Sequence, residues 1–192
     1  MPWHPEHKQQ TRERILLSAA KLFTRDGYEN VSINNVMTDA GLTRGAFYSH
    51  FATKSELYAE AIETSARQGR ARIEESSLQP LELNALIKGY LSQEHRRGEL
   101  LSCPLAFLIT DISQRDDQVR DTYTRVFKGF VNNLCQHQEG EAAEVKTQAL
   151  QTAVMMIGGV AIARAINDDQ LAEVLLEACQ QTVLQEPVPE PV

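Results

Sequence analysis

The sequence of 192 residues has little of what marks a secreted, metal-binding or membrane-spanning protein. Its three cysteines, Cys103, Cys135 and Cys179, are far apart, and no CxxC or Cys/His cluster has the spacing of metal ligands. A scattered, odd set of this kind predicts no disulfide framework, no metal site and a reducing, cytoplasmic setting. The first residues carry no apolar run, so no secretory signal is expected.

Long apolar runs and catalytic motifs are also missing. The longest apolar stretch covers roughly residues 153–163, whereas a membrane-spanning helix needs about 20 such residues, so a buried helix is expected there and no membrane partner. No GxSxG, HExxH or phosphate-binding loop occurs, and we expect neither a cofactor nor an enzyme. An enzyme with Cys103 as nucleophile and His95 or His137 as base is an alternative that no motif supports.

The charge is distributed unevenly along the chain. The formal net charge is −7, yet residues 1–55 hold seven Lys or Arg against five Asp or Glu, which gives this segment +2 and leaves −9 for the remainder. The local potential decides where a polyanion docks, so a mildly basic N-terminal part on an acidic body is compatible with DNA binding.

Apolar residues recur at helical spacing throughout, and nothing between residues 33 and 51 alternates as a strand would. The first helix is expected over residues 8–26 and ends at Gly27. Ser32 and Thr43 are expected to cap two short helices of eight residues each, INNVMTDA and RGAFYSHF, and Gly41 ends the first of them.

A longer fourth helix is expected to open at Thr53, whose capping box is completed by Glu56. The pattern then predicts helices over residues 55–76, 81–97, 103–112, 117–137, 142–166 and 169–185. The expected fold is therefore all-α with about nine helices: a three-helix helix-turn-helix domain over residues 8–57 and a helical ligand-binding and dimerisation domain over residues 58–185. Residues 186–192, rich in proline, are expected to be disordered.

Two short helices joined by a glycine turn, behind a longer supporting helix, form a helix-turn-helix. The second helix must be thin at its N-terminal end to enter a major groove about 12 Å wide. That end has small residues around one long donor, and it comprises Thr43, Arg44, Gly45 and Ala46. Polar residues at the edges of the motif are placed to reach phosphates, and they are Ser32, Tyr48, His50 and Lys54.

The stretch SINNVMTDAGLTRGAFYSHFATKSELYAEAI resembles the N-terminal domain of the TetR/AcrR repressors, over about residues 10–60. The resemblance rests on the cap Ser32, the turn Ala40–Thr43, the run Phe47–Phe51 and the opening Lys54–Leu57. It implies that Thr43 to Ala46 face bases in double-stranded DNA and that the four edge residues hold the backbone. The pair Asn34–Asn35 departs from the usual residues and leaves the base preference open.

Simpler roles exist for three of these residues. Tyr48 could pack against the first helix, His50 could end a helix as a cap, and Arg44 could be a solvated charge. The combination of residues favours the DNA-binding interpretation over the separate alternatives.

The resemblance also implies a homodimer in which the last two helices form a four-helix bundle with those of the partner. Residues 149–166 are apolar nearly all round, and Gly158–Gly159 would allow helices to approach closely. The expected interface residues are Met156, Ile157, Val160, Ile162, Leu171 and Leu175. A hairpin packed only within one chain is the alternative.

A small-molecule effector is expected to bind the helical domain over residues 58–185 and release the protein from a palindromic operator. The candidate pocket residues are Cys103, Phe107, Tyr123, Phe127 and Met155, which could equally fill an ordinary core. An electrophile- or redox-sensing role for Cys103, at a helix start next to Pro104, is an alternative. Two further alternatives for the function are a transcriptional activator and an architectural DNA-binding protein.

Overall fold

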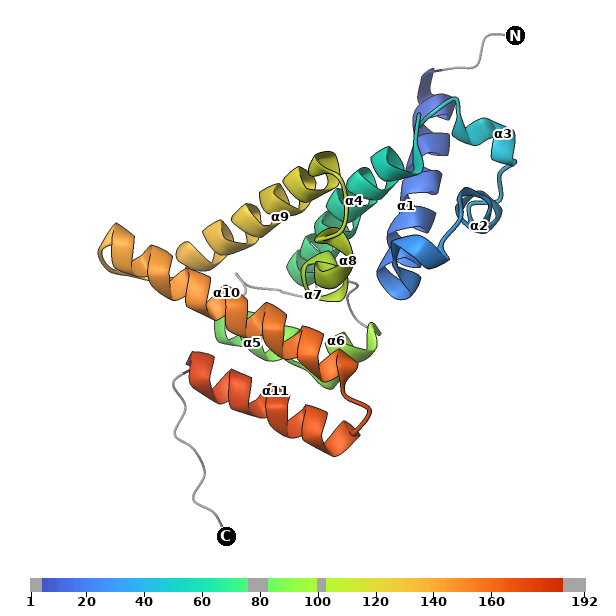
Figure 1. Ribbon diagram of the computed structural model, residues 1–192. Helices are drawn as coiled ribbons and strands as arrows, with labels where there is room; N and C mark the ends of the chain where they lie inside the picture. The colour runs from blue at the N-terminus through green and yellow to red at the C-terminus, as the bar shows by residue number, and fades with distance from the viewer. Residues whose placement is uncertain (1–4, 76–82, 100–102, 185–192) are drawn as a thin grey trace. The chain divides into compact units, whose positions relative to one another are not determined.

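The computed structural model describes residues 5–75, 83–99 and 103–184, and within these ranges the chain forms α-helices and no strand. These ranges contain eleven helices, which Figure 1 labels: α1 (Pro5–Asn30), α2 (Ile33–Asp39), α3 (Arg44–Phe47), α4 (Lys54–Glu75), α5 (Leu83–Tyr90), α6 (Gln93–Arg97), α7 (Pro104–Phe107), α8 (Ile109–Ile112), α9 (Asp117–Cys135), α10 (Ala142–Ala165) and α11 (Asp169–Leu184). The expected all-α fold is confirmed. No helix in these ranges is both long and apolar enough to cross a membrane. The predicted disordered tail, residues 186–192, lies outside the described residues.

Two breaks raise the number of helices above the nine or so expected. The segment predicted over residues 81–97 divides at Ser92, whose extended backbone (φ −111°, ψ 160°) and side chain cap α6. The segment over residues 103–112 divides at Leu108 (φ −116°, ψ 5°), which leaves two one-turn helices, α7 and α8. Buried apolar residues continue across the break at Leu108, from Leu105 to Ile112, so hydrophobic periodicity gives no sign of it. Beyond Ser92 the buried side chains are those of His95 and Arg96, which carry no apolar pattern.

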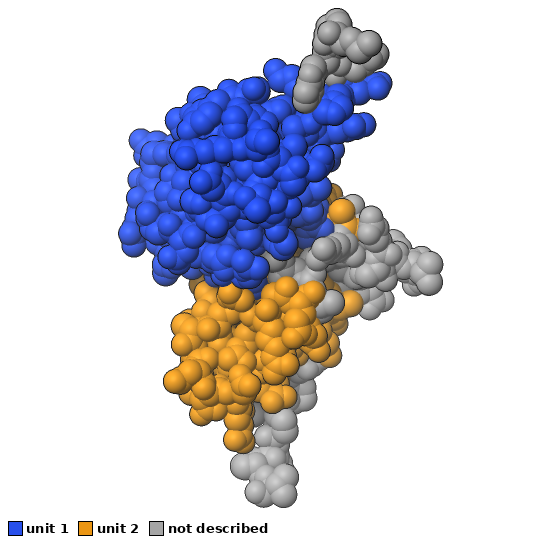
Figure 2. All heavy atoms as spheres, turned by 90° about the vertical axis from the view of Figure 1, so that its right-hand side faces the viewer, with its two compact units in different colours: residues 1–69, 102–126 blue, residues 70–101, 127–192 orange. Residues whose placement is uncertain are grey.

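The chain packs as two compact units, which Figure 2 distinguishes by colour. Unit 1 comprises residues 1–69 and 102–126, and unit 2 comprises residues 70–101 and 127–192. Unit 1 therefore contains the helix-turn-helix segment together with α7 and α8. The predicted functional domains follow the order of the chain instead, and they stay a prediction.

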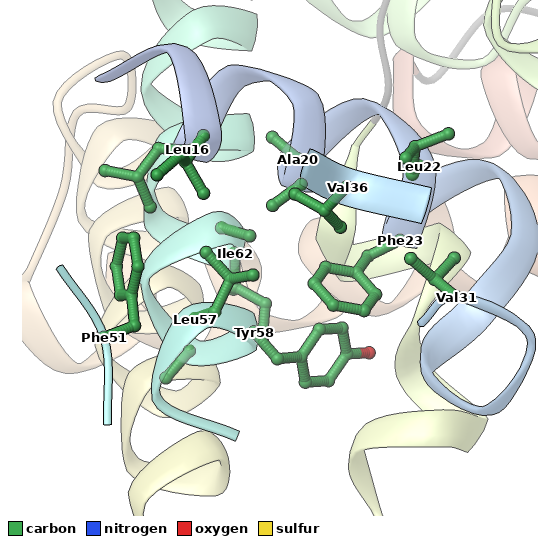
Figure 3. Close-up of a cluster of buried hydrophobic side chains, with 14 of the residues drawn as sticks. Leu16, Ala20, Leu22, Phe23, Val31, Val36, Phe51, Leu57, Tyr58 and Ile62 are labelled. Carbon is green, nitrogen blue, oxygen red and sulfur yellow. The ribbon is translucent and has the colours of Figure 1, made fainter. Parts of the chain in front are cut away.

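The core of unit 1 forms where one face of α1 meets α2 and α4. Ile15, Ala19 and Phe23 repeat every four residues along α1 and are almost completely buried. Leu108 and Ile112, from the α7–α8 segment, belong to the same cluster. Figure 3 shows the central part of this core, with Leu16, Ala20, Phe23, Val36, Phe51, Leu57, Tyr58 and Ile62 among the labelled side chains. The apolar face predicted for the first helix is thus confirmed, and α2 packs against it.

In unit 2, α10 and α11 lie side by side as an antiparallel pair (Figure 1). Gly159 lies on the buried face of α10, where an added Cβ would be 3.0 Å from the Cys179 Sγ atom and 3.1 Å from Leu91 Cδ2. A glycine at this position therefore lets α11 and Leu91 approach α10 closely. The neighbouring Gly158 has nothing within 4 Å of its added Cβ among the described residues.

Candidate nucleic-acid interface

α2 begins at a reciprocal cap between Ser32 and Asn35. The Ser32 hydroxyl accepts a hydrogen bond from the Asn35 N–H at 3.1 Å, and the Asn35 side chain accepts one from the Ser32 N–H at 2.9 Å. Each bond satisfies a backbone donor near the helix start that no carbonyl of the helix can reach. The expected cap at Ser32 is confirmed. Sequence reasoning missed Asn35, because Glu or Gln is the usual partner at that position.

The turn between α2 and α3 is built on Gly41. Its φ of 65° lies in the left-handed region, which glycine adopts without strain. The Ala40 carbonyl, at the end of α2, accepts a hydrogen bond from Arg14 Nη2 at 2.6 Å. A Cβ on Gly41 would lie 3.1 Å from that nitrogen. Glycine at this position therefore permits the backbone turn and also leaves room for the Arg14 side chain. Arg14, which the sequence did not single out, thereby fixes α2 to α1.

α3 is shorter than the sequence suggested. The pattern predicted eight residues, but the helix covers Arg44–Phe47, after which the N–H groups of Ser49 and His50 donate to carbonyls three residues earlier. Thr43 has the extended backbone of an N-cap (φ −79°, ψ 150°), although its side chain makes no capping hydrogen bond. A single turn of α3, followed by a tight turn, therefore presents the candidate base-contacting residues.

The start of α3 is open to solvent. Thr43, Arg44 and Gly45 are exposed, and Ala46 is half-buried. A Cβ added to Gly45 meets nothing within 4 Å, and the Arg44 guanidinium has no hydrogen bond or ion pair within the part of the chain that the structure describes. One unpaired guanidinium among small residues has the shape and the donors that read a guanine edge in the major groove.

Tyr48 directly follows this exposed turn. Its side chain is 60% exposed, and its ring packs edge-on against Phe47 with 5.1 Å between ring centroids. The structure thus places the tyrosine on its neighbour and in solvent rather than in a packed site on α1. Its hydroxyl is free to approach a DNA backbone.

His50 lies half-buried at the end of the same turn. Its buried Nδ1 atom has no hydrogen-bond partner among the described residues. Burial, and then the positive charges of Lys8 and Arg12, lower the pKa of the imidazole. The neutral side chain is therefore favoured in the free protein, and a nearby phosphate would favour the charged one.

Lys54 is engaged at a place that the sequence did not predict. The expected capping box at the start of α4 is present in part: the Thr53 hydroxyl accepts from the Glu56 N–H at 3.0 Å, while the Glu56 carboxylate accepts from the Ala52 N–H at 2.6 Å. The Lys54 ammonium donates to the Tyr28 carbonyl at 2.5 Å and lies 4.0 Å from the centroid of the Tyr28 ring. Burial is the main cause that lowers the pKa of Lys54.

Several cations around the motif already have anionic partners. The ion pairs are Arg12–Glu60 at 2.5 Å, Lys21–Asp39 at 2.8 Å and Arg25–Asp26 at 2.6 Å. The pairing lowers the pKa of Asp26 and of Asp39, mainly through hydrogen bonds from Arg25 and Lys21 respectively. Arg14 and Lys54 contact backbone carbonyls instead, and Arg44 and Lys8, both exposed, have no ion-pair partner in the described residues.

The candidate effector residues are divided between the units. Cys103, Phe107 and Tyr123 belong to unit 1, and Phe127 and Met155 to unit 2. The Tyr123 hydroxyl donates to the Leu105 carbonyl at 2.9 Å, and burial raises the pKa of Tyr123 to about 12. A surface depression between α4 and α9 is lined by other, mostly charged side chains, which include Glu60, Glu63, Asp121 and Arg125. The pocket assignment stays a prediction.

The sensor role considered for Cys103 loses part of its physical basis. The cysteine is the N-cap of α7, but that helix has four residues, so its dipole is small. Arg96, which is close to Cys103 in the sequence, donates hydrogen bonds to the Ala163 carbonyl and to the Asp169 carboxylate. The described residues also contain no group of three or more potential metal ligands.

The predicted dimer-interface residues lie on two different faces. Met156, Ile157 and Val160 are buried within the chain, with exposed fractions between 0 and 4%, so they offer little surface to a partner subunit, and their place in the interface stays a prediction. They face inward because the periodicity of α10 places them on the face that packs inside unit 2. Ile162 and Leu171 are more than half exposed, and Leu175 is half-buried. These three stay candidates for a partner subunit.

Comparison with known proteins adds independent support for the helix-turn-helix. Residues 15–61 match the model of the family described as bacterial regulatory proteins, tetR family. The HTH-type transcriptional regulator AcrR of Shigella flexneri is 42% identical over 60 residues, a match that covers 31% of this chain and 28% of that protein. The uncharacterised HTH-type regulator YxaF of Bacillus subtilis is 27% identical over 169 residues, covering 82% of this chain and 87% of that protein.

Solved structures extend the likeness to the whole fold. A TetR-family transcriptional regulator from Cytophaga hutchinsonii superposes with a TM-score of 0.78 at 17% identity, covering 96% of this chain and 98% of that one. The reduced form of E. coli NemR superposes with a TM-score of 0.72 at 18% identity, covering 95% and 100% respectively. At these identities the likeness concerns the fold. Residues 15–61 thus match the tetR family of bacterial regulatory proteins, and the whole chain has the fold of solved TetR-family regulators.

Proposed function

We propose that this regulator binds a palindromic operator in double-stranded DNA as a homodimer and represses transcription until a small-molecule effector releases it. In this proposal residues 8–57 bind DNA, and residues 58–185 bind the effector and the partner subunit. The observation that carries it is Arg44 at the start of α3, which is exposed and has no partner among the described residues. Because the target is chromosomal DNA, the protein would act in the cytoplasm.

The assignment of individual contacts follows from exposure and chemistry. Arg44 would donate two hydrogen bonds to one guanine, with Thr43, Gly45 and Ala46 as small neighbours that let α3 enter the groove. Other residues at the edge of the motif would hold the backbone, and they are Ser32, Tyr48, His50 and Lys54. An ammonium has three donors, so Lys54 can keep its bond to Tyr28 and still donate to a phosphate.

The homodimer is supported by apolar side chains that the chain leaves in solvent. Val154 and Ile162 on α10, and Leu171 and Val174 on α11, are between 53 and 64% exposed. Exposed apolar residues gathered on two paired helices are typical of a protein interface. A twofold dimer would present two α3 helices to half-sites about one helical turn, or a multiple, apart.

Selection of bound duplexes from a random DNA pool tests the DNA-binding proposal. We expect one palindromic sequence to be enriched, with half-sites on one face of the duplex. Absence of any enriched sequence would overturn it. The same sequence, placed between a promoter and a reporter gene, should lower expression when the regulator is present, whereas raised expression would identify an activator.

Release by an effector is supported by the resemblance to ligand-responsive repressors and by the aromatic side chains Phe107, Tyr123 and Phe127. The reporter strain, grown with a panel of small molecules, should regain expression with at least one of them. A Phe127→Ala variant should then still repress but respond less. A response that is unchanged in this variant would remove Phe127 from the proposed pocket.

A further inference from the structure

Tyr28 is held through both of its peptide groups by side chains from other parts of the chain. α1 is interrupted at Gly27, whose φ of 78° and ψ of 169° turn the backbone out of the helix. The Tyr28 N–H therefore leaves the helical pattern and donates to the Asp111 carboxylate at 2.8 Å. The Tyr28 carbonyl accepts a hydrogen bond from the Lys54 ammonium at 2.5 Å.

The ring of Tyr28 is fixed as well. The Lys54 ammonium lies 4.0 Å from the ring centroid and the Arg115 guanidinium 4.5 Å from it, both within the range of cation–π attraction. The Tyr58 ring lies 4.9 Å away, centroid to centroid. Arg115 is in turn held by Glu29, at 2.7 Å. Tyr28 therefore cannot shift without disturbing the cations that contact it.

Asp111 joins α8 to this arrangement. One of its carboxylate oxygens accepts from the Tyr28 N–H and, also at 2.8 Å, from the buried Tyr58 hydroxyl of α4. Its other oxygen lies 3.5 Å from Arg115. Burial first, and then the hydrogen bond to Asp111, raise the pKa of Tyr58, which remains a neutral donor. A carboxylate on α8 thus fixes the end of α1 and the first turns of α4 at once.

We propose that Tyr28 is a relay that lets α8 position the Lys54 ammonium for the DNA backbone. Asp111 fixes the N–H of Tyr28, and the carbonyl and ring of the same residue orient Lys54. Asp111 is therefore a positioning residue for DNA binding, although it lies 83 residues from Tyr28 in the sequence. This relay rests on the proposed phosphate contact of Lys54.

The relay accounts for the presence of α8 in the same unit as the helix-turn-helix. A displacement of α8 would withdraw the Asp111 carboxylate from the Tyr28 N–H. The Tyr28 carbonyl, which accepts the hydrogen bond from Lys54, would then be held less firmly. An ammonium that is no longer oriented must lose more conformational freedom to reach a phosphate, which weakens binding. The position of α8 would thereby set how strongly Lys54 binds one phosphate of the DNA backbone.

A double-mutant cycle on the selected operator tests the relay. Full-length wild type, Asp111→Asn, Lys54→Ala and the double variant are compared by their dissociation constants at several salt concentrations. Lys54→Ala should reduce the slope of log K against log salt by about one, as expected for one lost phosphate contact. Asp111→Asn should reduce affinity severalfold in the wild-type background and have little effect when Lys54 is already absent.

Two further measurements make the result specific. Hydrogen exchange at the Tyr28 amide should become faster in Asp111→Asn, because a neutral amide oxygen is a weaker acceptor than a carboxylate. Glu63→Gln removes the same charge from an exposed pair with Arg125 and should leave both the salt slope and the exchange at Tyr28 unchanged. Circular dichroism establishes that each variant is folded.

The outcomes separate the relay from the proposed function. A wild type that selects no DNA overturns the proposed function. A Lys54→Ala variant with the wild-type salt slope overturns the phosphate contact and the relay together. If Lys54→Ala lowers the slope but the effect of Asp111→Asn is equally large in both backgrounds, the relay is wrong and the DNA contact stands.

Discussion

The guanidinium of Arg96 lies 2.7 Å from the carboxylate of Asp169, the first residue of α11. The same guanidinium donates to the carbonyls of Ala163, at 2.8 Å, and Ile166, at 3.0 Å, at the end of α10. A side chain of α6 therefore satisfies helix-end carbonyls of α10 and holds the beginning of α11. In addition, the Arg164 guanidinium of α10 donates a hydrogen bond to the Arg96 carbonyl at 2.7 Å.

Loss of this side chain should destabilise unit 2. Arg96→Ala leaves two carbonyls without their donor, and we expect the free energy of unfolding to fall by about 2–4 kcal/mol in urea titrations. Arg97→Ala is the matched control, because Arg97 is 53% exposed and 4.0 Å from Asp169. Its effect should stay below about 1 kcal/mol. Equal effects of the two substitutions would contradict the role given to Arg96.

Two glycines in helices should respond in opposite ways to alanine. Gly129, in α9, is exposed and has nothing near an added Cβ among the described residues, so Gly129→Ala should stabilise the protein by about 0.5–1 kcal/mol. Gly159→Ala must push apart Leu91 and Cys179 and should destabilise it, despite the same gain in helix propensity. Thermal unfolding of the two variants measures both signs. A stabilised Gly159→Ala would show that α10 and α11 are not packed this closely.

The two faces of α10 give a sharp test of the dimer. Ile162 is 55% exposed and Ile157 is 4% exposed. Ile162→Glu should therefore leave the chain folded but monomeric, whereas Ile157→Glu buries an unpaired charge and should unfold it. Light scattering and circular dichroism separate the two results. A folded Ile162→Glu that is still fully dimeric would mean that subunits associate through another surface.

Stability should fall in mild acid, with His95 as a main cause. The side chain is fully buried, and burial is the principal effect that lowers its pKa, against the hydrogen bond with the Tyr90 carbonyl. The unfolded chain then takes up the proton first, so stability is highest above a pH of about 6.5 and is lost as the pH falls below it. His95→Asn keeps a donor for Tyr90 but cannot titrate, so its stability should depend less on pH between about 7 and 5. An unchanged dependence in denaturant titrations would exclude His95 as the cause.

Local signals predicted much of the fold. Phe23 and its neighbours on α1 lie where helical spacing places them, because burial of one face is a local property of the sequence. Gly27 and Gly41 interrupt helices at the positions expected, since a positive φ is a property of the residue itself. The exposed start of α3 follows from the same local rules.

Properties that depend on distant residues could not be predicted in this way. The partner of Tyr28 on α8, Asp111, belongs to a segment with no sequence pattern that links it to α1. α10 is apolar nearly all round, so its periodicity does not tell which face meets its own chain, and it does not indicate that Ile157 is buried there. Lys54 was assigned to phosphate alone, because the end of α1 that it contacts is set by tertiary packing.

The most direct test of the central claim is the ratio of affinities for the selected operator and for a randomised duplex of equal length. Arg44→Ala should weaken operator binding by about 1–3 kcal/mol and binding to the randomised duplex much less, so the ratio should fall. Arg67→Ala removes an arginine of α4 that is also exposed and should preserve the ratio. An unchanged ratio in Arg44→Ala would contradict the claim that α3 reads the DNA sequence through this residue.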